Sequence, residues 1–355
     1  MDTKEFKLAV DLLVKERGID KDIIYEALEL ALTSAYKKNY HSLPNVRVEI
    51  DDVAGKVKVV SFMTVVEEVE DDRIELSLDE AQKLVPDIKI GETIEEEVTP
   101  KDFGRVAAAT AKQVVVQKIR EAERNNIIEE YGDKQDEMVS GLVAMEDVRN
   151  YYIDLGKTQG ILPKNEIIPG EKIKMGSTIK VYITKVENNS KGPLILLSRN
   201  HYGFVKRLFE LEIPEINDGL ILIYSVARDA GNRSKVAVYS ENSNIDPVGS
   251  CIGERGSRIN NIIKELNGEK IDVVNYDKDS AKFIENALSP AKNLRVFITD
   301  EKKKEALVIV DDDNLSLAIG KKGSNVRLAA RLTHFKIDVK TVEQAKEDGI
   351  NIVTE

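Results

Sequence analysis

Two short segments in the C-terminal third of the chain have residue types and spacing suited to binding a phosphate group. Residues 252–257 read Ile-Gly-Glu-Arg-Gly-Ser, and residues 319–324 read Ile-Gly-Lys-Lys-Gly-Ser. Because glycine lacks a Cβ and tolerates positive φ, a turn with two glycines lets the backbone approach a phosphate closely. A helix that begins directly after the turn directs its free N–H groups and its positive dipole end at the same anion. Each segment therefore predicts an anion clamp made of backbone.

The two segments are parts of one longer unit that occurs twice. Gly253 and Gly320 are 67 residues apart, and each turn is followed by a strand pattern, Lys-Ile-Asp-Val, at 270–273 and again at 336–339. A lone Gly-x-x-Gly is more often an ordinary turn, but its duplication with a matching helix and strand favours a ligand-binding role. A Gly-x-x-Gly turn that opens a helix is the RNA backbone clamp of the KH domain. We therefore predict two tandem KH domains that hold single-stranded RNA.

The polar residues in and after each turn are the predicted RNA contacts. The second turn has two lysines, whereas Glu254 weakens the positive charge of the first, so we expect the second unit to contribute more phosphate affinity. We expect the polar side chains of the second unit to be exposed. The predicted RNA-binding residues are Gly253, Glu254, Arg255, Gly256 and Arg258 in the first unit, and Gly320, Lys321, Lys322, Gly323, Asn325, Arg327 and Arg331 in the second.

The composition is that of a globular protein with enough apolar residues for several cores. Of 355 residues, 42% are hydrophobic and 32% are charged. No segment is apolar enough to cross a bilayer, and the N-terminus lacks the apolar stretch of a signal peptide. Cys251 is the only cysteine, and with three histidines it leaves no zinc-ligand cluster. We therefore expect a cytoplasmic protein without disulfides, bound metal or membrane contact. We also expect a monomer.

The net charge of -11 is unusual for an RNA-binding protein, but its distribution explains it. Residues 1–134 contain 20 basic and 30 acidic residues, whereas the remainder contains 32 and 33. Residues 315–340 contain six lysines or arginines and one aspartate. A local basic region is sufficient for phosphate binding, whatever the total charge.

The spacing of apolar residues predicts a multidomain α+β protein. Helical spacing occurs twice near the N-terminus, alternating strand patterns follow, and the absence of Gly and Pro from Arg105 to Tyr131 predicts one long connector helix. Five short strand patterns between 135 and 200 predict a small closed barrel of the OB type. Each KH unit is predicted in the order α-β-β-α-α-β, the type II arrangement. The two N-terminal helices are predicted from Phe6, Ala9, Val10 and Leu13, and from Ile24, Ala27, Leu28 and Ala31.

Several longer motifs make the whole chain resemble the bacterial NusA family of transcription factors. Residues 34–40 read Ser-Ala-Tyr-Lys-Lys-Asn-Tyr, 102–108 read Asp-Phe-Gly-Arg-Val-Ala-Ala, and 228–235 read Arg-Asp-Ala-Gly-Asn-Arg-Ser-Lys. Residues 286–291, Asn-Ala-Leu-Ser-Pro-Ala, join the two KH units as in that family. The chain departs from the family at His334-Phe335, where Gly-Trp is usual, and at Tyr276, where Trp is common.

The resemblance implies a domain order and a set of partners. It implies an α/β RNA-polymerase-binding domain over 1–134, an S1 barrel of the OB type over 135–200, KH domains over 201–277 and 278–345, and a short tail over 346–355. The expected partners are RNA polymerase near the β flap, nascent single-stranded RNA and RNA hairpins, and other Nus antitermination factors. Four basic residues occupy the positions at which the family is thought to contact the nascent hairpin: Lys37, Lys38, Arg105 and Lys112. The alternative is that they only balance the negative charge of an acidic domain.

The predicted function is that of a non-enzymatic elongation factor that modulates pausing, termination and antitermination. Nothing in the sequence suggests a catalytic set, and we expect no cofactor. Because the chain ends soon after the second KH unit, we also expect no C-terminal acidic repeats of the kind that some relatives use for autoregulation. Two alternatives remain open. One is an accessory protein of RNA degradation, since KH and S1 modules also accompany RNA-degrading enzymes, and the other is an RNA chaperone.

Overall fold

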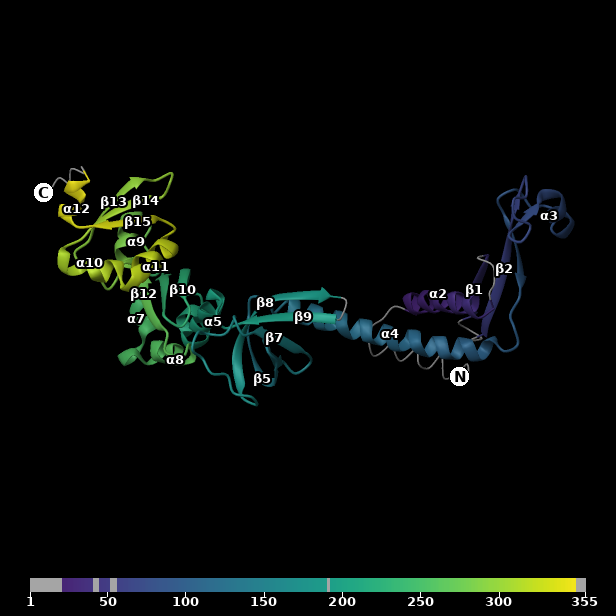
Figure 1. The fold of residues 1–355 in the computed structure, drawn as a ribbon, viewed down its shortest axis with the longest axis horizontal. Coiled ribbons are helices and arrows are strands. Elements are labelled where there is room, and N and C mark those ends of the chain that lie inside the picture. The colour runs from purple at the N-terminus through teal and green to yellow at the C-terminus, as the bar shows by residue number, and fades with distance from the viewer. Residues whose placement is uncertain (1–20, 41–44, 52–55, 190–191, 349–355) are drawn as a thin grey trace. The chain divides into compact units, whose positions relative to one another are not determined.

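The computed structural model describes residues 21–40, 45–51, 56–189 and 192–348, and these form two compact units. The first unit ends at Ile127 and the second begins at Ile128, so the division falls within one long helix, α4 (Phe103–Gly132). This helix confirms the connector predicted from the Gly- and Pro-free stretch (Figure 1). The first predicted helix, at Phe6 to Leu13, lies outside the described residues. No helix in the described part of the chain is long and apolar enough to cross a membrane.

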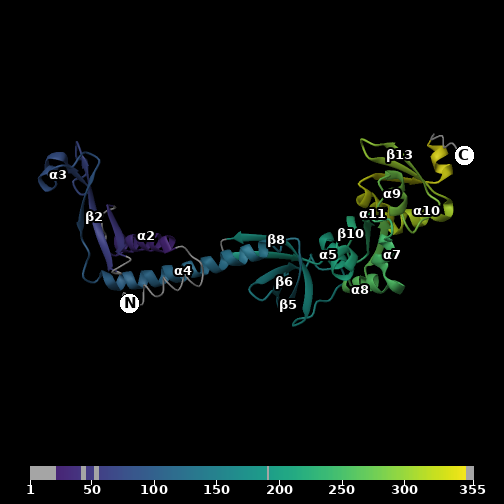
Figure 2. The same ribbon diagram turned by 180° about the vertical axis from the view of Figure 1, so that it is seen from behind.

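The first unit consists of a four-stranded sheet and helices that cover it. Helix α2 (Lys21–Tyr40) lies alongside α4 in both views, and Leu32, Tyr36, Phe103 and Ala107 form their shared core (Figures 1 and 2). The sheet order is β1-β2-β3, with β4 also paired to β2. Its strands are β1 (Val46–Asp51), β2 (Lys56–Val66), β3 (Glu75–Ser77) and β4 (Thr93–Glu97), and α3 (Leu78–Leu84) follows β3.

Side chains of α2 complete the hydrogen bonding of the edge strand β1. The backbone N–H of Val48 donates to Thr33 Oγ1 at 2.9 Å, and that of Ile50 donates to Glu29 Oε1 at 3.1 Å. An edge strand otherwise leaves such donors free for pairing with another chain. The helix therefore covers this edge of the sheet as well as packing on it.

The S1-like region is a closed five-stranded barrel, as the strand patterns predict. The strands close in the order β5-β6-β7-β9-β8, and Val143, Ile153, Leu162, Val181 and Ile195 are buried inside. Bulges interrupt the pairing of β5 with β6 and of β8 with β9, which bends the strands enough to close the barrel. The strands are β5 (Met138–Glu146), β6 (Asn150–Asp154), β7 (Gln159–Pro163), β8 (Thr178–Asn189) and β9 (Gly192–Ser198).

The two KH-like units repeat one topology, in which a three-stranded sheet pairs first antiparallel and then parallel. This confirms the predicted type II order. The first unit contains α5 (Tyr202–Glu212), α6 (Pro214–Asn217), β10 (Leu222–Asp229), β11 (Arg233–Tyr239), α7 (Pro247–Ile252), α8 (Ser257–Glu265) and β12 (Lys270–Asn275). The second contains α9 (Ser280–Ala287), β13 (Arg295–Asp300), β14 (Glu305–Ile309), α10 (Asp312–Ile319), α11 (Ser324–Thr333) and β15 (Lys336–Lys340), followed by α12 (Val342–Glu347).

Shared cores join the three modules of the second unit. Ala227, Ala237 and Val274 on the first KH sheet are buried against α9 and α11 of the second KH unit, so that α11 lies between the two sheets (Figure 1). Tyr182 of the barrel is buried in the core of the first KH unit, where its ring leaves no room for a side chain at Gly203. The barrel and both KH units therefore form one continuous structure.

Candidate nucleic-acid interface

The two Gly-x-x-Gly turns have the same backbone conformation despite their different sequences. Gly253 and Gly320 have φ, ψ values of 74°, 172° and 74°, 169°. The residues before the second glycines, Arg255 and Lys322, have left-handed values of 52°, 27° and 54°, 32°. Each turn is followed at once by its helix, α8 or α11, whose N-cap glycine offers no side-chain hydrogen bond. The N–H of the first helical residue, Ser257 or Ser324, donates to the carbonyl of Glu254 or Lys321. An anion would therefore meet the positive end of the helix dipole and the N–H groups that follow this residue.

The first glycine of each turn is required for space as well as for its φ value. A Cβ on Gly253 would lie 2.8 Å from Arg258 Cγ, and one on Gly320 would lie 2.8 Å from both Cβ and the backbone N of Asn325. A Cβ on Gly323 would meet nothing within 4 Å, so at that position only the positive φ favours glycine. The outer side of the second turn is therefore open to a ligand.

In both units, the side chain five positions after the first glycine donates hydrogen bonds to the segment just before the turn. In the second unit Asn325 Nδ2 donates to the carbonyls of Leu317 at 3.0 Å, Ala318 at 3.2 Å and Leu288 at 2.9 Å. In the first unit Arg258 occupies the equivalent position and donates to the carbonyl of Ser250, the counterpart of Leu317, at 2.8 Å. An amide in one unit and a guanidinium in the other thus hold the end of the helix that precedes the turn.

The predicted exposure of Asn325 is wrong, because its side chain is only 1% exposed. Its amide satisfies carbonyl groups at the end of α10 and in the linker between the KH units, and buried carbonyls need such donors. Arg258 is also engaged, since its guanidinium pairs with Glu215 at 2.8 Å, although its side chain remains 32% exposed. Both residues position the turns, and a spacing-based prediction cannot separate such a role from ligand contact.

The charged residues of the turns themselves point outward. Lys321 and Lys322 are exposed in the second turn, as are Glu254 and Arg255 in the first. Arg327 and Arg331, on the exposed side of α11, lie near the turn after β10, with Arg327 Nη2 3.8 Å from Asp229 Oδ2 and Arg331 Nη1 3.5 Å from the carbonyl of Arg228. The second KH unit therefore presents a row of cations that begins at its turn and reaches the first unit.

Two buried arginines, to which no sequence pattern assigned a role, fasten the barrel to the first KH unit. Arg199, 3% exposed, pairs with Glu171 at 2.6 Å and with Glu265 at 3.1 Å. Arg228, 2% exposed, pairs with the fully buried Glu269 at 2.9 Å and donates to the carbonyls of Arg199 and His201. Burial lowers the pKa of Arg228, an effect that Glu269 opposes. The Arg199–Glu265 pair and the two hydrogen bonds of Arg228 to carbonyls at the end of the barrel fix the orientation of the barrel relative to the first clamp.

The motif at 228–235 is a structural centre of the first KH unit. Glu269 accepts hydrogen bonds from Ser234 Oγ at 2.5 Å and from the backbone N–H of Gly231 at 2.9 Å, in addition to Arg228. Lys235 is fully buried, and its Nζ contacts Asp272 Oδ2 at 3.0 Å and the carbonyl of Ser289 at 2.8 Å. Burial lowers the pKa of Lys235. The motif that supports the family resemblance therefore holds the barrel, the first sheet and the linker together.

The four candidate hairpin contacts of the first unit lie on its two packed helices. Lys37 and Lys38 are in the last turns of α2, and Arg105 and Lys112 are in the first turns of α4. Lys38, Arg105 and Lys112 are exposed and Lys37 is half-buried. The same unit has a strongly acidic part, because residues 67–97 contain 13 carboxylate side chains and three cations. The four basic residues therefore lie on α2 and α4, outside this acidic segment.

The chain matches four family models that cover most of its length. They are the NusA N-terminal domain over residues 5–125, the S1 RNA binding domain over 133–197, the NusA-like first KH domain over 199–276 and the NusA-like second KH domain over 280–347.

Curated relatives match nearly the whole chain. The transcription termination/antitermination protein NusA of Bacillus subtilis is 52% identical over 96% of this chain and 92% of the relative. That of Halalkalibacterium halodurans is 50% identical over 98% and 90%, and that of Thermus thermophilus is 40% identical over 96% and 90%. On these matches, the chain belongs to the NusA family of transcription termination/antitermination proteins.

Proposed function

We propose that this protein is a transcription elongation factor that binds RNA polymerase through one region and nascent RNA through another. Residues 1–134 would contact polymerase near the RNA exit channel at the β flap, while the barrel at 135–200 and the KH domains at 201–277 and 278–345 would bind emerging RNA. The factor acts as a cytoplasmic monomer without catalytic activity, and other Nus antitermination factors are further partners. The family membership supports this assignment.

The RNA-binding part of this proposal rests on two turns that have matching dihedral angles and belong to one continuous structure. Each turn places an uncapped helix N-terminus behind a backbone that a phosphate can approach, and the second adds Lys321 and Lys322. Because the KH units share a core, a single RNA strand can meet both clamps without the entropic cost of ordering a flexible linker.

The effect on transcription follows from linkage. A factor that binds a paused polymerase and its RNA hairpin better than the elongating state shifts the equilibrium toward the pause. Lys37, Lys38, Arg105 and Lys112 would contact the hairpin phosphates, and their positions on two packed helices give them a fixed spacing. The same shift would alter the choice between termination and antitermination.

The test is a transcription assay on a template with a hairpin-dependent pause, which compares the full chain with residues 135–355. We expect only the full chain to prolong the pause, because the shorter chain lacks the polymerase-binding region. A full-chain variant with Lys37, Lys38, Arg105 and Lys112 changed to Gln separates polymerase binding from hairpin contact. If the full chain leaves the pause unchanged yet binds RNA, an RNA chaperone or an accessory protein of RNA degradation becomes the better assignment.

A further inference from the structure

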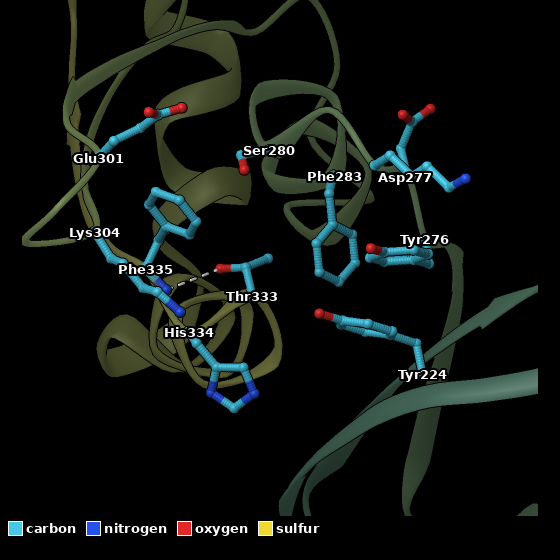
Figure 3. A pocket seen from close by; sticks show the side chains of 11 residues that line it. Tyr224, Tyr276, Asp277, Ser280, Phe283, Glu301, Lys304, Thr333, His334 and Phe335 are labelled. Carbon is cyan, nitrogen blue, oxygen red and sulfur yellow. Dashed lines mark hydrogen bonds between the residues drawn. The ribbon is translucent and has the colours of Figure 1, made fainter.

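A pocket of about 300 Å³ opens where the two KH units meet, apart from both Gly-x-x-Gly turns. Its walls come from β10 and the end of β12 in the first unit, and from α9, the β13–β14 hairpin and the end of α11 in the second (Figure 3). The family matches assign no role to this pocket, and the proposed phosphate clamps do not include it. The principal lining residues are Tyr224, Tyr276, Lys278, Phe283, Lys304 and His334.

One wall of this junction pocket is a stack of aromatic rings. Tyr224 and Tyr276 lie face to face, with ring centroids 3.8 Å apart and planes 16° from parallel. Phe283 meets both rings edge-on, at 5.7 Å from Tyr224 and 5.1 Å from Tyr276. Tyr276 is half-buried among its neighbours, whereas Tyr224 is 47% exposed and is the more accessible ring of the stack. An exposed, rigidly backed aromatic face is a platform for another planar ring.

The remaining walls supply positive charge and polar groups. Lys278, Lys304 and His334 line the pocket and are exposed. Two acidic residues, Asp277 and Glu301, also line the pocket. The charge of Asp277 is compensated by an ion pair with Lys282 at 2.9 Å, so Glu301 is the lining carboxylate whose charge opposes the lysines. Both tyrosine hydroxyls point toward the side formed by Thr333 and His334 (Figure 3). A planar ring attached to an anionic backbone matches this combination of platform and cations.

The pocket is connected to the second clamp by α11. This ten-residue helix begins at the Gly320–Gly323 turn and ends beside the pocket at Thr333 and His334, so the two sites are about 15 Å apart along the helix axis. The exposed cations Arg327 and Arg331 lie between them on the same helix. A strand held at the turn can therefore follow this basic face toward the junction.

We propose that the junction pocket binds one base of the single-stranded RNA by stacking on Tyr224, with the phosphates on either side of that base near Lys278 and near Lys304. The inference rests on the proposed RNA-binding function and adds a base-stacking site to the phosphate clamps. Stacking of a base on an aromatic side chain contributes about 1–3 kcal/mol, so its loss weakens binding about 5- to 150-fold. Stacking is tolerant of sequence because every base has a π-face.

The experiment measures binding of labelled oligoadenylate, about 14 nucleotides long, to the full chain and its variants at one stated salt concentration. Tyr224→Leu keeps an apolar side chain but removes the aromatic platform, and Tyr224→Phe keeps the platform. Tyr202→Leu is the matched control, because Tyr202 is 55% exposed and lies outside the pocket. We expect Tyr224→Leu to weaken binding about tenfold and the other two variants to bind as the parent chain does.

An abasic scan of the same RNA makes the test specific. One abasic position should weaken binding to the parent chain and have no further effect on Tyr224→Leu, since that variant already lacks the stacking partner. If Tyr224→Leu misfolds, a chain with Lys278→Gln and Lys304→Gln, both exposed positions, should still show reduced affinity and a shallower salt dependence.

The outcomes separate this inference from the function on which it rests. If Tyr224→Leu and the lysine variant bind RNA normally while a chain with Lys321→Asp and Lys322→Asp does not, the pocket is not an RNA site and the clamp assignment survives. If Tyr224→Leu instead loses capture of RNA polymerase, the aromatic platform docks a protein side chain and the base-stacking inference is wrong. If the parent chain itself fails to bind oligoadenylate and every other single-stranded RNA tried, the proposed function and the inference fall together.

Discussion

The two KH units have turns of the same backbone conformation but are built from different side chains. The dihedral angles of the paired glycines differ by at most a few degrees, whereas the intervening residues are Glu-Arg in one and Lys-Lys in the other. The supporting residue is Arg258 in the first unit and Asn325 in the second. The clamp geometry therefore depends on where glycines and a carbonyl-binding donor lie, while the charge of the turn is free to vary.

The units also differ in how they are anchored. The first is joined to the barrel by the Arg199–Glu265 ion pair and by hydrogen bonds from Arg228, whose charge is paired with the buried Glu269, to the carbonyls of Arg199 and His201. The second is joined to the first mainly by the apolar faces of α9 and α11. Buried ion pairs are sensitive to removal of one partner, because the other charge then remains without compensation. An apolar interface weakens in smaller steps, in proportion to the area removed from it. The anchoring of the first unit should therefore be more sensitive to a single substitution than that of the second.

The largest effect is expected for Arg228→Met, which removes the cation and leaves Glu269 fully buried without its counter-charge. We expect a loss of about 3–5 kcal/mol in the free energy of unfolding, measured by urea denaturation of the full chain. Arg295→Met, at an exposed position of the second unit, should change it by less than about 0.5 kcal/mol. Equal effects of the two substitutions would show that the buried charge pair of Arg228 and Glu269 contributes no more to stability than an exposed residue.

A smaller effect is expected at the residue that supports each turn. Asn325→Leu removes three hydrogen bonds to buried carbonyls and should cost about 2–3 kcal/mol, although it also removes Asn325 Oδ1, which has no partner among the described residues. Arg258→Leu should cost about 1 kcal/mol, because Arg258 is partly exposed and water can replace part of its bonding. Urea denaturation of both variants checks this order, and a larger loss for Arg258→Leu would reverse the comparison.

Exchanging the charges of the turns should change RNA affinity without changing stability. A chain with Lys321→Glu and Lys322→Glu should bind single-stranded RNA at least tenfold more weakly, with a salt dependence shallower by about 0.7 for each phosphate that is no longer neutralised. Glu254→Lys should strengthen binding severalfold, because it gives the first turn the charge of the second. RNA titrations at several salt concentrations measure the affinity and its salt dependence for each variant. Thermal unfolding checks that the variants are folded. Unchanged affinity in both variants would mean that RNA does not reach the turns.

The smallest expected effect is a pH dependence where the barrel meets the first KH unit. His201 Nδ1 accepts the N–H of Gly203 at the start of α5, and burial lowers the pKa of His201 despite the opposing charges of Asp136 and Glu166. Since the unfolded chain takes up this proton at higher pH than the folded one, stability is full above about pH 6.5 and decreases as the pH falls toward the folded-state pKa.

This pH dependence can be separated from that of other groups by His201→Asn, which retains an acceptor for the N–H of Gly203 and cannot titrate. The thermal midpoint of the parent chain should fall by a few degrees between about pH 7 and pH 5 relative to that of His201→Asn. A parallel pH dependence of the two chains would show that His201 is not the titrating group.

Most helices, strands and turns could be predicted from local patterns. The long connector helix, the five barrel strands and the type II order of the KH units all follow from periodicity and turn residues. The prediction for Asn325 was wrong because helical spacing places it beside exposed residues, and only packing against the linker reveals that its amide is buried. The junction pocket is likewise beyond spacing arguments, since Tyr224 and His334 are separated by 110 positions in the chain.

The repeated turns could be read from the residues alone, because a Gly-x-x-Gly before a helix imposes local dihedral angles that need no distant partner. Motifs such as 228–235 likewise identified the family, without revealing what those residues do. The folded chain was needed to show that Arg228, Glu269 and Lys235 are buried among charged partners, and that two clamps share one core. The physical reason is that ion pairing and burial depend on which distant segments pack together, whereas backbone dihedral angles depend mainly on near neighbours.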